Sequence, residues 1–355
     1  MKDNIKISKR CRRNLHKKPN VVGVGVGYRE KGGRKTGEKA ILVFVTKKVA
    51  PHKLNGGEMV PRVLRGKRVD VIEIGEVRLL ENDSATSQEE EESPLSEGSR
   101  LKRWRPATGG VSIGHYKITA GTLGCAVKDP ATGERFILSN NHVLANSSSG
   151  EDGRASAGDP VLQPGPYDGG RLDLDTIALL ARFVPLRPTL QPPKCAAARH
   201  WESLANKILK VMRPAYCLLL RKSNEEGNLV DAALAGPLGE TDLAPEIMEL
   251  GRISGTAEAY PGDEVVFSGR TSGVVRGSVI ARDVSLFVTM EPGKELYFVD
   301  QLITSAVSRP GDSGSLLLDG KNRAVGLLFA GSQTVSVCNR IQNVCTLLGV
   351  EPDPG

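Results

Sequence analysis

The larger, C-terminal part of this chain is a long succession of short apolar runs separated by glycine-rich turns. Between residues 108 and 355 these runs are GTLGCAV, RFILSNNHVL, EVVFSG, SGVVRGSVIA, VSLFVTM, SLLLDG and AVGLLFAG. Such runs are typical of β-strands, and aromatic residues are scarce (4%) while the chain holds 40 glycines and 21 prolines. The pattern predicts a mainly β protein whose strands form antiparallel barrels.

Three segments of different composition precede this region. Residues 1–19 are predicted to be a basic tail. Residues 20–80 contain β-like runs around the charged loop REKGGRKTGEK, which predicts a small β-rich or α+β domain; the loop fits no phosphate-binding glycine pattern. Residues 81–107 are predicted to be an acidic, disordered linker. The linker ends in the basic cluster LKRWR, interpreted as a solvated linker end or as an exposed cleavage site.

One segment interrupts the strand pattern. Between residues 194 and 222, apolar side chains recur at helical spacing, which predicts an amphipathic helix within an insertion over residues 186–222. The apolar positions are Trp201, Leu204, Ile208, Val211 and Met212. We expect this face to pack on the adjoining barrel; a membrane surface or a partner protein would explain the same spacing.

Composition favours a cytoplasmic protein. The N-terminus lacks the apolar core of a secretory signal, and no apolar run is long enough to span a bilayer. Six cysteines without a CxxC pair favour reduced thiols, with a disulfide between Cys338 and Cys345 as the less favoured alternative. The net charge of +7 could attract anionic partners, but no nucleic-acid motif accompanies it, so no nucleic-acid partner is expected.

Ser313 is a candidate nucleophile because it lies between two glycines in the turn PGDSGS. A serine hydroxyl attacks carbonyl groups at neutral pH when an imidazole takes its proton and a carboxylate orients that imidazole. Of the five histidines, His142 has the most suggestive setting, since it ends a turn after a strand in RFILSNNHVLA. His115, in GVSIGHYKI, is the alternative base.

LSNNHVLA and PGDSGS resemble the histidine and nucleophile motifs of the trypsin-like (chymotrypsin-fold) serine proteases, and they occur in the order of that family. The resemblance spans about residues 108–350 and is nearest to bacterial intracellular-type trypsin-like peptidases and plant narrow-leaf proteases. It implies two six-stranded antiparallel β-barrels, at about 108–240 and 241–350 within a protease domain of 108–355. It also implies a serine endopeptidase that acts on a protein or peptide and uses no metal or organic cofactor.

The same resemblance implies a catalytic acid between His142 and Ser313. Asp175 in DLDTIALL and Asp231 in GNLVDAALA both look like the aspartate of that family. The visible strands of the second barrel start near Glu264, so the last strand of the first barrel should lie shortly before that residue. Asp231 is therefore the favoured acid, and Asp175 remains the alternative.

The turn at Ser313 also predicts an oxyanion hole, because it aims the backbone N–H groups of Gly311 and Ser313 at one point. By resemblance to the family, the substrate pocket includes Val307, Phe329 and Gly331. Val307 stands where members that cleave after Lys or Arg carry an aspartate. We therefore expect a small or aliphatic residue before the cleaved bond.

Two other functions are compatible with the sequence. A protease-like domain could bind ligands in a closed cleft without cleaving them. The basic tail and the inserted helix could instead form a surface for nucleic acid or acidic membrane, whose binding would weaken steeply with salt. A homo-oligomer is compatible with the sequence as well.

Overall fold

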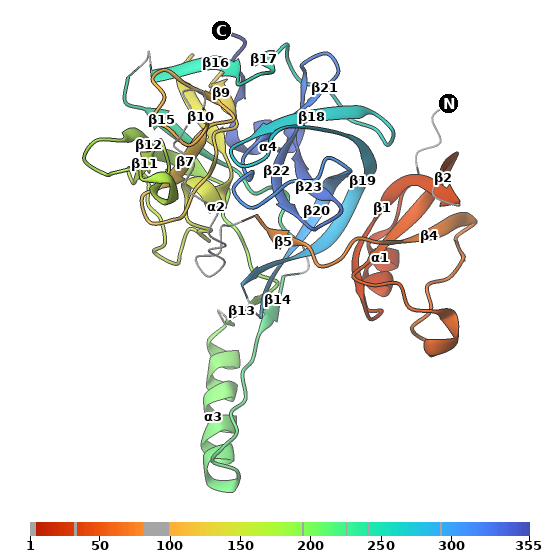
Figure 1. Cartoon of the computed structure of the whole chain (residues 1–355). Helices are drawn as coiled ribbons and strands as arrows, with labels where there is room; N and C mark the ends of the chain where they lie inside the picture. Colours follow the sequence, from red (N-terminus) through yellow and green to blue (C-terminus); the bar gives the residue numbers. More distant parts are fainter. Residues whose placement is uncertain are drawn as a thin grey trace, which may run out of the picture.

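The strands of this chain fall mostly into two large sheets, so the prediction of a mainly β protein is confirmed (Figure 1). The acidic residues 81–98 of the predicted linker lie outside the described residues. The computed structural model describes residues 5–31, 34–80, 99–193, 195–224, 226–239, 242–291 and 293–355.

The first barrel is the 8-stranded sheet with strand order β24-β9-β10-β15-β12-β11-β7-β8. Strand β8, at one end of this order, and β9, next to the other end, follow one another in the chain, and buried apolar side chains of this sheet form one cluster. The strands are β7 (Ser112–His115), β8 (Gly121–Thr122), β9 (Cys125–Lys128), β10 (Arg135–Ser139), β11 (Pro160–Leu162), β12 (Thr176–Phe183), β15 (Ala233–Pro237) and β24 (Glu351–Pro352).

The second barrel closes through a pairing between β18 and β19. Its order is β18-β21-β22-β23-β20-β19, and β18 also pairs with β19, so every one of these strands has two neighbours. The helix α4 (Ile341–Leu348) follows the last strand. The strands are β18 (Glu264–Gly269), β19 (Gly273–Glu291), β20 (Lys294–Thr304), β21 (Leu316–Asp319), β22 (Ala324–Gly331) and β23 (Ser336–Arg340).

The N-terminal strands extend the sheet of the second barrel. Sequence analysis predicts a small domain for residues 20–80, and its strand β1 pairs antiparallel with β19 to give an 11-stranded sheet. The glycines of VVGVGVGY permit this close approach: a Cβ at Gly25 would lie 2.6 Å from the Val284 side chain. The strands are β1 (Val21–Lys31), β2 (Arg34–Val45), β3 (Val63–Leu64) and β4 (Lys67–Glu73); the short helix η1 (Pro51–Lys53) lies between β2 and β3.

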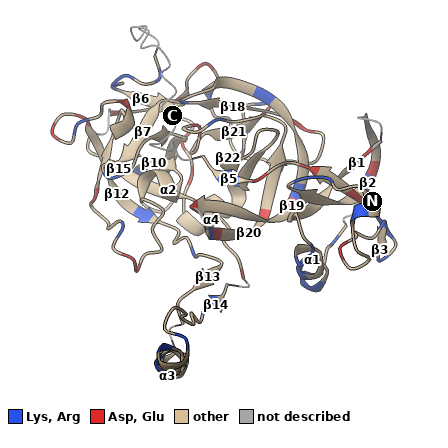
Figure 2. Cartoon of the chain, turned by 60° about the horizontal axis from the view of Figure 1, so that its bottom comes forward, with Lys and Arg blue, Asp and Glu red and all other residues tan. Residues whose placement is uncertain are grey.

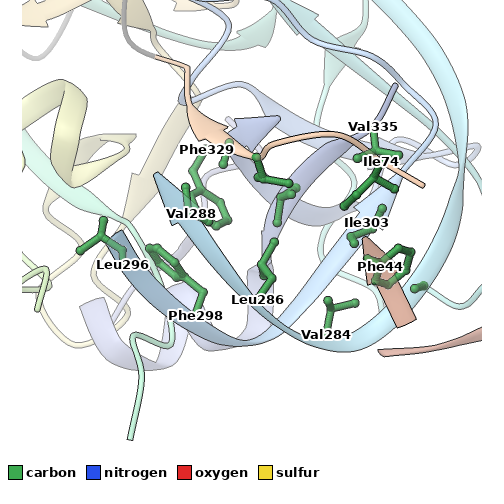
Figure 3. Close-up of a cluster of buried hydrophobic side chains, with 14 of the residues drawn as sticks. Phe44, Ile74, Val284, Leu286, Val288, Leu296, Phe298, Ile303, Phe329 and Val335 are labelled. Atoms are coloured by element: carbon green, nitrogen blue, oxygen red, sulfur yellow. The ribbon is translucent and has the colours of Figure 1, made fainter. Parts of the chain in front are cut away.

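An apolar cluster joins the N-terminal strands to the second barrel (Figure 3). Phe44 of β2 and Ile74, just after β4, lie in the same buried cluster as side chains of β19, β20 and β22. Within it the rings of Phe298 and Phe329 lie 4.5 Å apart between centroids. Burial of this apolar surface stabilises the attachment of the N-terminal strands to the barrel.

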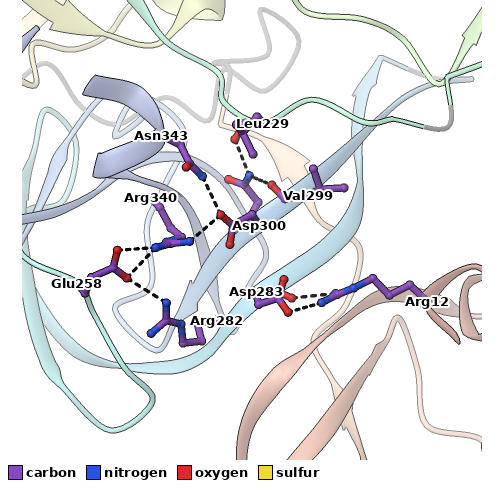
Figure 4. Close-up of polar contacts among 10 residues, drawn as sticks. Arg12, Leu229, Glu258, Arg282, Asp283, Val299, Asp300, Arg340 and Asn343 are labelled. Atoms are coloured by element: carbon purple, nitrogen blue, oxygen red, sulfur yellow. Dashed lines mark hydrogen bonds and ion pairs between the residues drawn. The ribbon is translucent and has the colours of Figure 1, made fainter. Parts of the chain in front are cut away.

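The first nineteen residues, predicted to be a tail, contain the helix α1 (Lys9–His16). Arg12 fixes this helix to β19: its guanidinium donates to the carbonyl oxygen of Asp283 at 2.8 Å and pairs with the Asp283 carboxylate at 2.5 Å (Figure 4). The side chain of Leu15, in the same helix, is also buried. The basic residues of this segment are therefore partly used in packing, which the charge pattern alone did not indicate.

The His16 ring predicts a loss of stability in acid. It lies edge-on to Phe287 and Tyr297, its Nε2 is 3.0 Å from the Ser285 hydroxyl, and burial, with the Arg12 guanidinium nearby, lowers the pKa of His16 to about 4. Between the unfolded pKa near 6.5 and this value, only the unfolded chain binds the proton. The free energy of unfolding should therefore fall by about 2 kcal/mol between pH 7 and pH 5 through this group.

Urea unfolding at the two pH values, compared between wild type and His16→Gln, measures that effect. The variant should lose about 2 kcal/mol less than wild type over the same interval. His200→Gln, on the exposed surface of the inserted helix, is the matched control and should behave as wild type. An unchanged pH dependence in His16→Gln would contradict the prediction.

The predicted insertion is a projecting hairpin, and the expected packing of its helix on a barrel is wrong. The helix α3 (Ala196–Met212) has no buried residue; Trp201 is 66% exposed and Val211 85%. It extends away from both sheets (Figures 1 and 2) on a stalk made by β13 (Leu190–Gln191) and β14 (Lys222–Ser223). Helical spacing identifies an apolar face but does not say what covers it.

The end of the predicted linker is bound to the first barrel. The backbone N–H of Trp104 donates to the Gln163 side chain at 2.8 Å, and Arg105 donates to the same oxygen at 2.6 Å. Within the cluster LKRWR, Trp104 and Arg105 are partly buried, whereas Arg103 is exposed. The cluster leads into β6 (Ala107–Gly109), which forms a small sheet with β16 (Leu243–Ile247) and β17 (Gly251–Arg252).

All six cysteines lie among the described residues, and each is a free thiol. The alternative of a disulfide between Cys338 and Cys345 is not observed. In the part of the chain that the structure describes, no helix is both long and apolar enough to cross a membrane.

Candidate active site

A buried histidine and a buried aspartate form the centre of the candidate site. His142 lies in the short helix α2 (Asn141–Leu144) directly after β10, and Asp231 lies just before β15, which pairs with β10. The Nδ1 atom of His142 is 2.6 Å from Asp231 Oδ2, and its backbone N–H donates to Oδ1 at 3.2 Å. The two oxygens of one carboxylate therefore hold both the backbone and the ring of His142 and fix the orientation of the imidazole.

Two asparagines that the sequence analysis did not identify hold this aspartate. The side-chain amides of Asn140 and Asn339 donate to the backbone carbonyl of Asp231 at 2.8 and 3.0 Å. The backbone N–H of Asp231 donates to the Asn339 side chain at 3.1 Å. Asn140 lies within the histidine motif LSNNHVLA and could have been suspected, whereas Asn339 comes from β23 of the other barrel, where no sequence signal indicates it.

Ser313 lies in a tight turn between β20 and β21 and is 1% exposed. Both flanking glycines of the turn have positive φ, +93° at Gly311 and +96° at Gly314, which other residues rarely adopt. The carboxylate of Asp312 accepts from the backbone N–H groups of Thr271, Ser272 and Arg309 at 2.8 to 2.9 Å. The turn is therefore fixed from within and from the loop after β18.

The serine turn and the histidine helix meet across Gly121 of β8. A Cβ at this position would lie 2.5 Å from the side chain of Val143, the neighbour of His142, and 3.0 Å from the carbonyl oxygen of Ser313. The backbone N–H of Thr122 also donates to that carbonyl at 2.7 Å. The helix that carries His142 and the turn that carries Ser313 therefore lie on either side of Gly121, at the junction of the two barrels.

A peptide carbonyl from the N-terminal half lies against the serine. The backbone N–H of Gly311 donates to the carbonyl oxygen of Leu80 at 3.1 Å, and the Ser313 hydroxyl lies 3.4 Å from that oxygen. The same hydroxyl lies 3.4 Å from the carbonyl oxygen of Phe329. Leu80 was not predicted to belong to the site, because it stands more than two hundred residues away in a segment without a motif.

The two alternative residues of the sequence analysis have other partners. The Asp175 carboxylate accepts from the backbone N–H of Arg171 at 2.9 Å and pairs with Arg103 at 3.3 Å. His115 is buried and lies 3.1 Å from the Asp159 carboxylate. Both groups are thus engaged in separate interactions of the first barrel.

The three pocket candidates lie in different environments. Val307 is 37% exposed, and the ring of Phe329 packs on Phe298 in the cluster that holds the N-terminal strands. Only the carbonyl of Phe329 faces Ser313. A Cβ at Gly331 would lie 3.4 Å from the Leu80 side chain and 3.0 Å from the Ser308 hydroxyl, so this position adjoins the space that Leu80 fills.

Comparisons with known proteins identify one family model and several solved structures that resemble this chain. Residues 3–74 match the family model of the NARROW LEAF 1 N-terminal domain. Curated protein sequences give no match.

Among solved structures, Thermobifida fusca Protease A is 15% identical, with a TM-score of 0.44 over 70% of this chain and 98% of its own. Nocardiopsis protease is 15% identical, with a TM-score of 0.41 over 69% and 97%. Cellulomonas bogoriensis chymotrypsin is 16% identical, with a TM-score of 0.41 over 70% and 98%.

Proposed function

We propose that this protein is a serine endopeptidase in which Ser313, His142 and Asp231 form the catalytic triad. The observation that carries the proposal is the buried pair of His142 and Asp231, with 2.6 Å between Nδ1 and Oδ2, at the junction where the glycine-flanked Ser313 lies. A buried carboxylate that holds one nitrogen of an imidazole prepares the other nitrogen to accept a proton.

In this mechanism each group has one task. Ser313 Oγ attacks the carbonyl carbon of a peptide bond while Nε2 of His142 accepts its proton, and Asp231 stabilises the imidazolium that forms. The N–H of Gly311 stabilises the negative charge that develops on the carbonyl oxygen, an effect of about 3 kcal/mol per donor in related sites. The backbone N–H of Ser313 is the second donor proposed. His142 then protonates the leaving nitrogen, and water releases the acyl group.

We also propose a substrate class, a specificity and a cellular location for this activity. The substrate is a protein or peptide, the residue before the cleaved bond is small or aliphatic, and the protein acts in the cytoplasm. Chemistry of this kind needs only the side chains named above, so we propose no cofactor.

Labelling with a fluorophosphonate probe tests the proposal, because such probes form a covalent bond only with an activated serine. We expect the full chain to be labelled at Ser313, as located by mass spectrometry, and Ser313→Ala to remain unlabelled. Ser156→Ala, which removes an exposed hydroxyl on the first barrel, is the matched control and should be labelled as wild type.

The Leu80 carbonyl covers the Ser313 hydroxyl, so the assay includes the full chain with Leu80→Asp. A charged side chain at 80 should not remain in an apolar pocket, which would open the site to the probe. Absence of labelling at Ser313 in both wild type and Leu80→Asp would overturn the endopeptidase proposal in favour of a domain that binds without cleaving.

A further inference from the structure

The segment before residue 81 lies in the candidate site as an added strand. Its strand β5 (Arg78–Leu79) pairs antiparallel with β22, with Leu79 opposite Ala330 and Arg78 opposite Gly331. On its other side Arg78 pairs with Thr289 of β19 in parallel, and the N–H of Thr289 donates to the carbonyl of Val77 at 2.9 Å. The backbone is therefore extended and held on both sides, as peptides are when they bind at a strand edge.

The backbone of Leu80 continues this strand to the serine. Its N–H donates to the carbonyl of Phe329 at 3.4 Å, and its carbonyl oxygen accepts from the N–H of Gly311 at 3.1 Å. The carbonyl oxygen is also 3.4 Å from Ser313 Oγ. Gly311 is the donor expected to hold the developing oxyanion, so the Leu80 carbonyl occupies the place of the carbonyl under attack.

The side chain of Leu80 fills an apolar pocket of the second barrel. It is 6% exposed and belongs to a buried cluster with Ala306 and Leu328, which stand near the serine turn and on β22. Gly331 borders the same space, where a Cβ would come 3.4 Å from Leu80 Cδ2. The pocket thus contains a branched aliphatic side chain beside a glycine position where even a Cβ would be crowded.

We propose that the bond between Leu80 and Glu81 is a self-processing site, cleaved by Ser313 of the same chain, and that the pocket selects a branched aliphatic residue before the cleaved bond. The inference rests on the proposed endopeptidase function and names its first substrate. In sequence, the residues that would leave are acidic and nearly without apolar side chains, so burial offers little to keep them at the site.

The reaction balances with water as the only co-reactant. Ser313 Oγ bonds to the carbonyl carbon of Leu80, and its proton passes to His142. The carbon–nitrogen bond to Glu81 breaks, and His142 gives that proton to the new amine. Water, deprotonated by His142, then attacks the ester carbon, and His142 returns that proton to Ser313 Oγ as the carbon–oxygen bond to the serine breaks. The products are a carboxylate on Leu80 and an amino group on Glu81.

Before the reaction, the Ser313 hydroxyl points toward two backbone carbonyl oxygens. Ser313 Oγ now lies within hydrogen-bond distance of the carbonyl oxygens of Leu80 and Phe329. To transfer its proton the hydroxyl must turn toward His142, which requires rotation about one side-chain torsion. Such a rotamer change is fast in comparison with peptide hydrolysis, so it does not limit the rate of cleavage.

Incubation of purified full-length protein tests the inference. We expect wild type to yield a fragment with Glu81 at its N-terminus, as read by intact mass and N-terminal sequencing, and Ser313→Ala to remain intact. The rate should not change on dilution, since the substrate is tethered to the site. Leu80→Asp should remain uncleaved at this bond, whereas Leu95→Asp, the same change within residues 81–98, should be cleaved as wild type.

The outcomes separate this inference from the proposed function. If Ser313 is labelled by the fluorophosphonate but the chain stays intact at residue 80, or is cleaved there in Ser313→Ala as well, self-processing is overturned and the endopeptidase stands. A rate that rises in proportion to protein concentration would overturn cleavage within one chain. If Ser313 is labelled in no variant, the proposed function fails and self-processing fails with it.

Discussion

Replacement of Asp231 by Asn should lower kcat on a peptide substrate by about four orders of magnitude, as in other triads where this carboxylate becomes an amide. The amide is nearly isosteric, so the packing around Asn140 and Asn339 should persist. However, its NH₂ group cannot accept the Nδ1 proton of His142. The imidazole would then adopt the tautomer with Nε2 protonated, and Nε2 could no longer accept the proton of Ser313.

Steady-state kinetics with a peptide ester and a peptide amide measure this effect. Asp175→Asn is the matched control, because it makes the same chemical change at the other candidate acid, whose carboxylate bonds with Arg103 and Arg171. Its kcat should stay close to that of wild type. A large loss in Asp175→Asn together with normal kcat in Asp231→Asn would reverse the assignment of the acid.

The nucleophile and the base were predicted from local sequence, because each stands in a short run where turn, glycine and strand residues adjoin. The catalytic acid was harder to assign from sequence, because the residues around Asp175 and Asp231 have the same local pattern. The structure pairs only Asp231 with His142, through the neighbouring strands β10 and β15. Pairing between strands about ninety residues apart cannot be predicted from the sequence of either strand alone.

The same reason explains what the sequence did not predict about the N-terminal half. The apolar runs of residues 20–80 indicated strands, but nothing in them indicated that β1 would pair with β19 or that Leu80 would reach Gly311. The helix α3 shows the opposite case: its amphipathic spacing was correctly interpreted as a helix, yet its apolar face contacts no barrel. Local patterns predict elements, whereas non-local pairing decides their neighbours.

This arrangement has a consequence for processing at residue 80. The pairing of β1 with β19 and the ion pair of Arg12 with Asp283 do not depend on the chain connection after Leu80. The N-terminal fragment should therefore stay bound to the protease after cleavage, with its new carboxylate near Ser313. Other substrates gain access only when β5 leaves β22, so the fragment would compete with them as a bound product.

Replacement of Gly331 by Val should change the specificity of the pocket from leucine to alanine. Built on this backbone, a Cβ at residue 331 would lie 3.0 Å from the Ser308 hydroxyl, 3.2 Å from the Val335 carbonyl oxygen and 3.4 Å from the Leu80 side chain. Loss of room for a branched side chain should lower kcat/KM on leucine peptides by about 10²-fold, while peptides with alanine before the cleaved bond keep most of theirs.

The effect is measured as the ratio of kcat/KM for matched leucine and alanine peptides. Gly320→Val is the matched control, because a Cβ at Gly320 would meet no atom within 4 Å and the residue lies in an exposed turn. Its ratio should equal that of wild type. An unchanged ratio in Gly331→Val would show that Leu80 does not occupy the pocket for the residue before the cleaved bond.

Combining Gly331→Val with a second substitution tests whether residues 80 and 331 share the same pocket. Gly331→Val alone should slow self-cleavage at residue 80, because the leucine no longer fits. Combining it with Leu80→Ala should restore cleavage, since the methyl group leaves room for the valine. A structural defect from either change would add to the other in the double variant, whereas complementary shapes compensate, so recovery is expected only if residues 80 and 331 share one pocket.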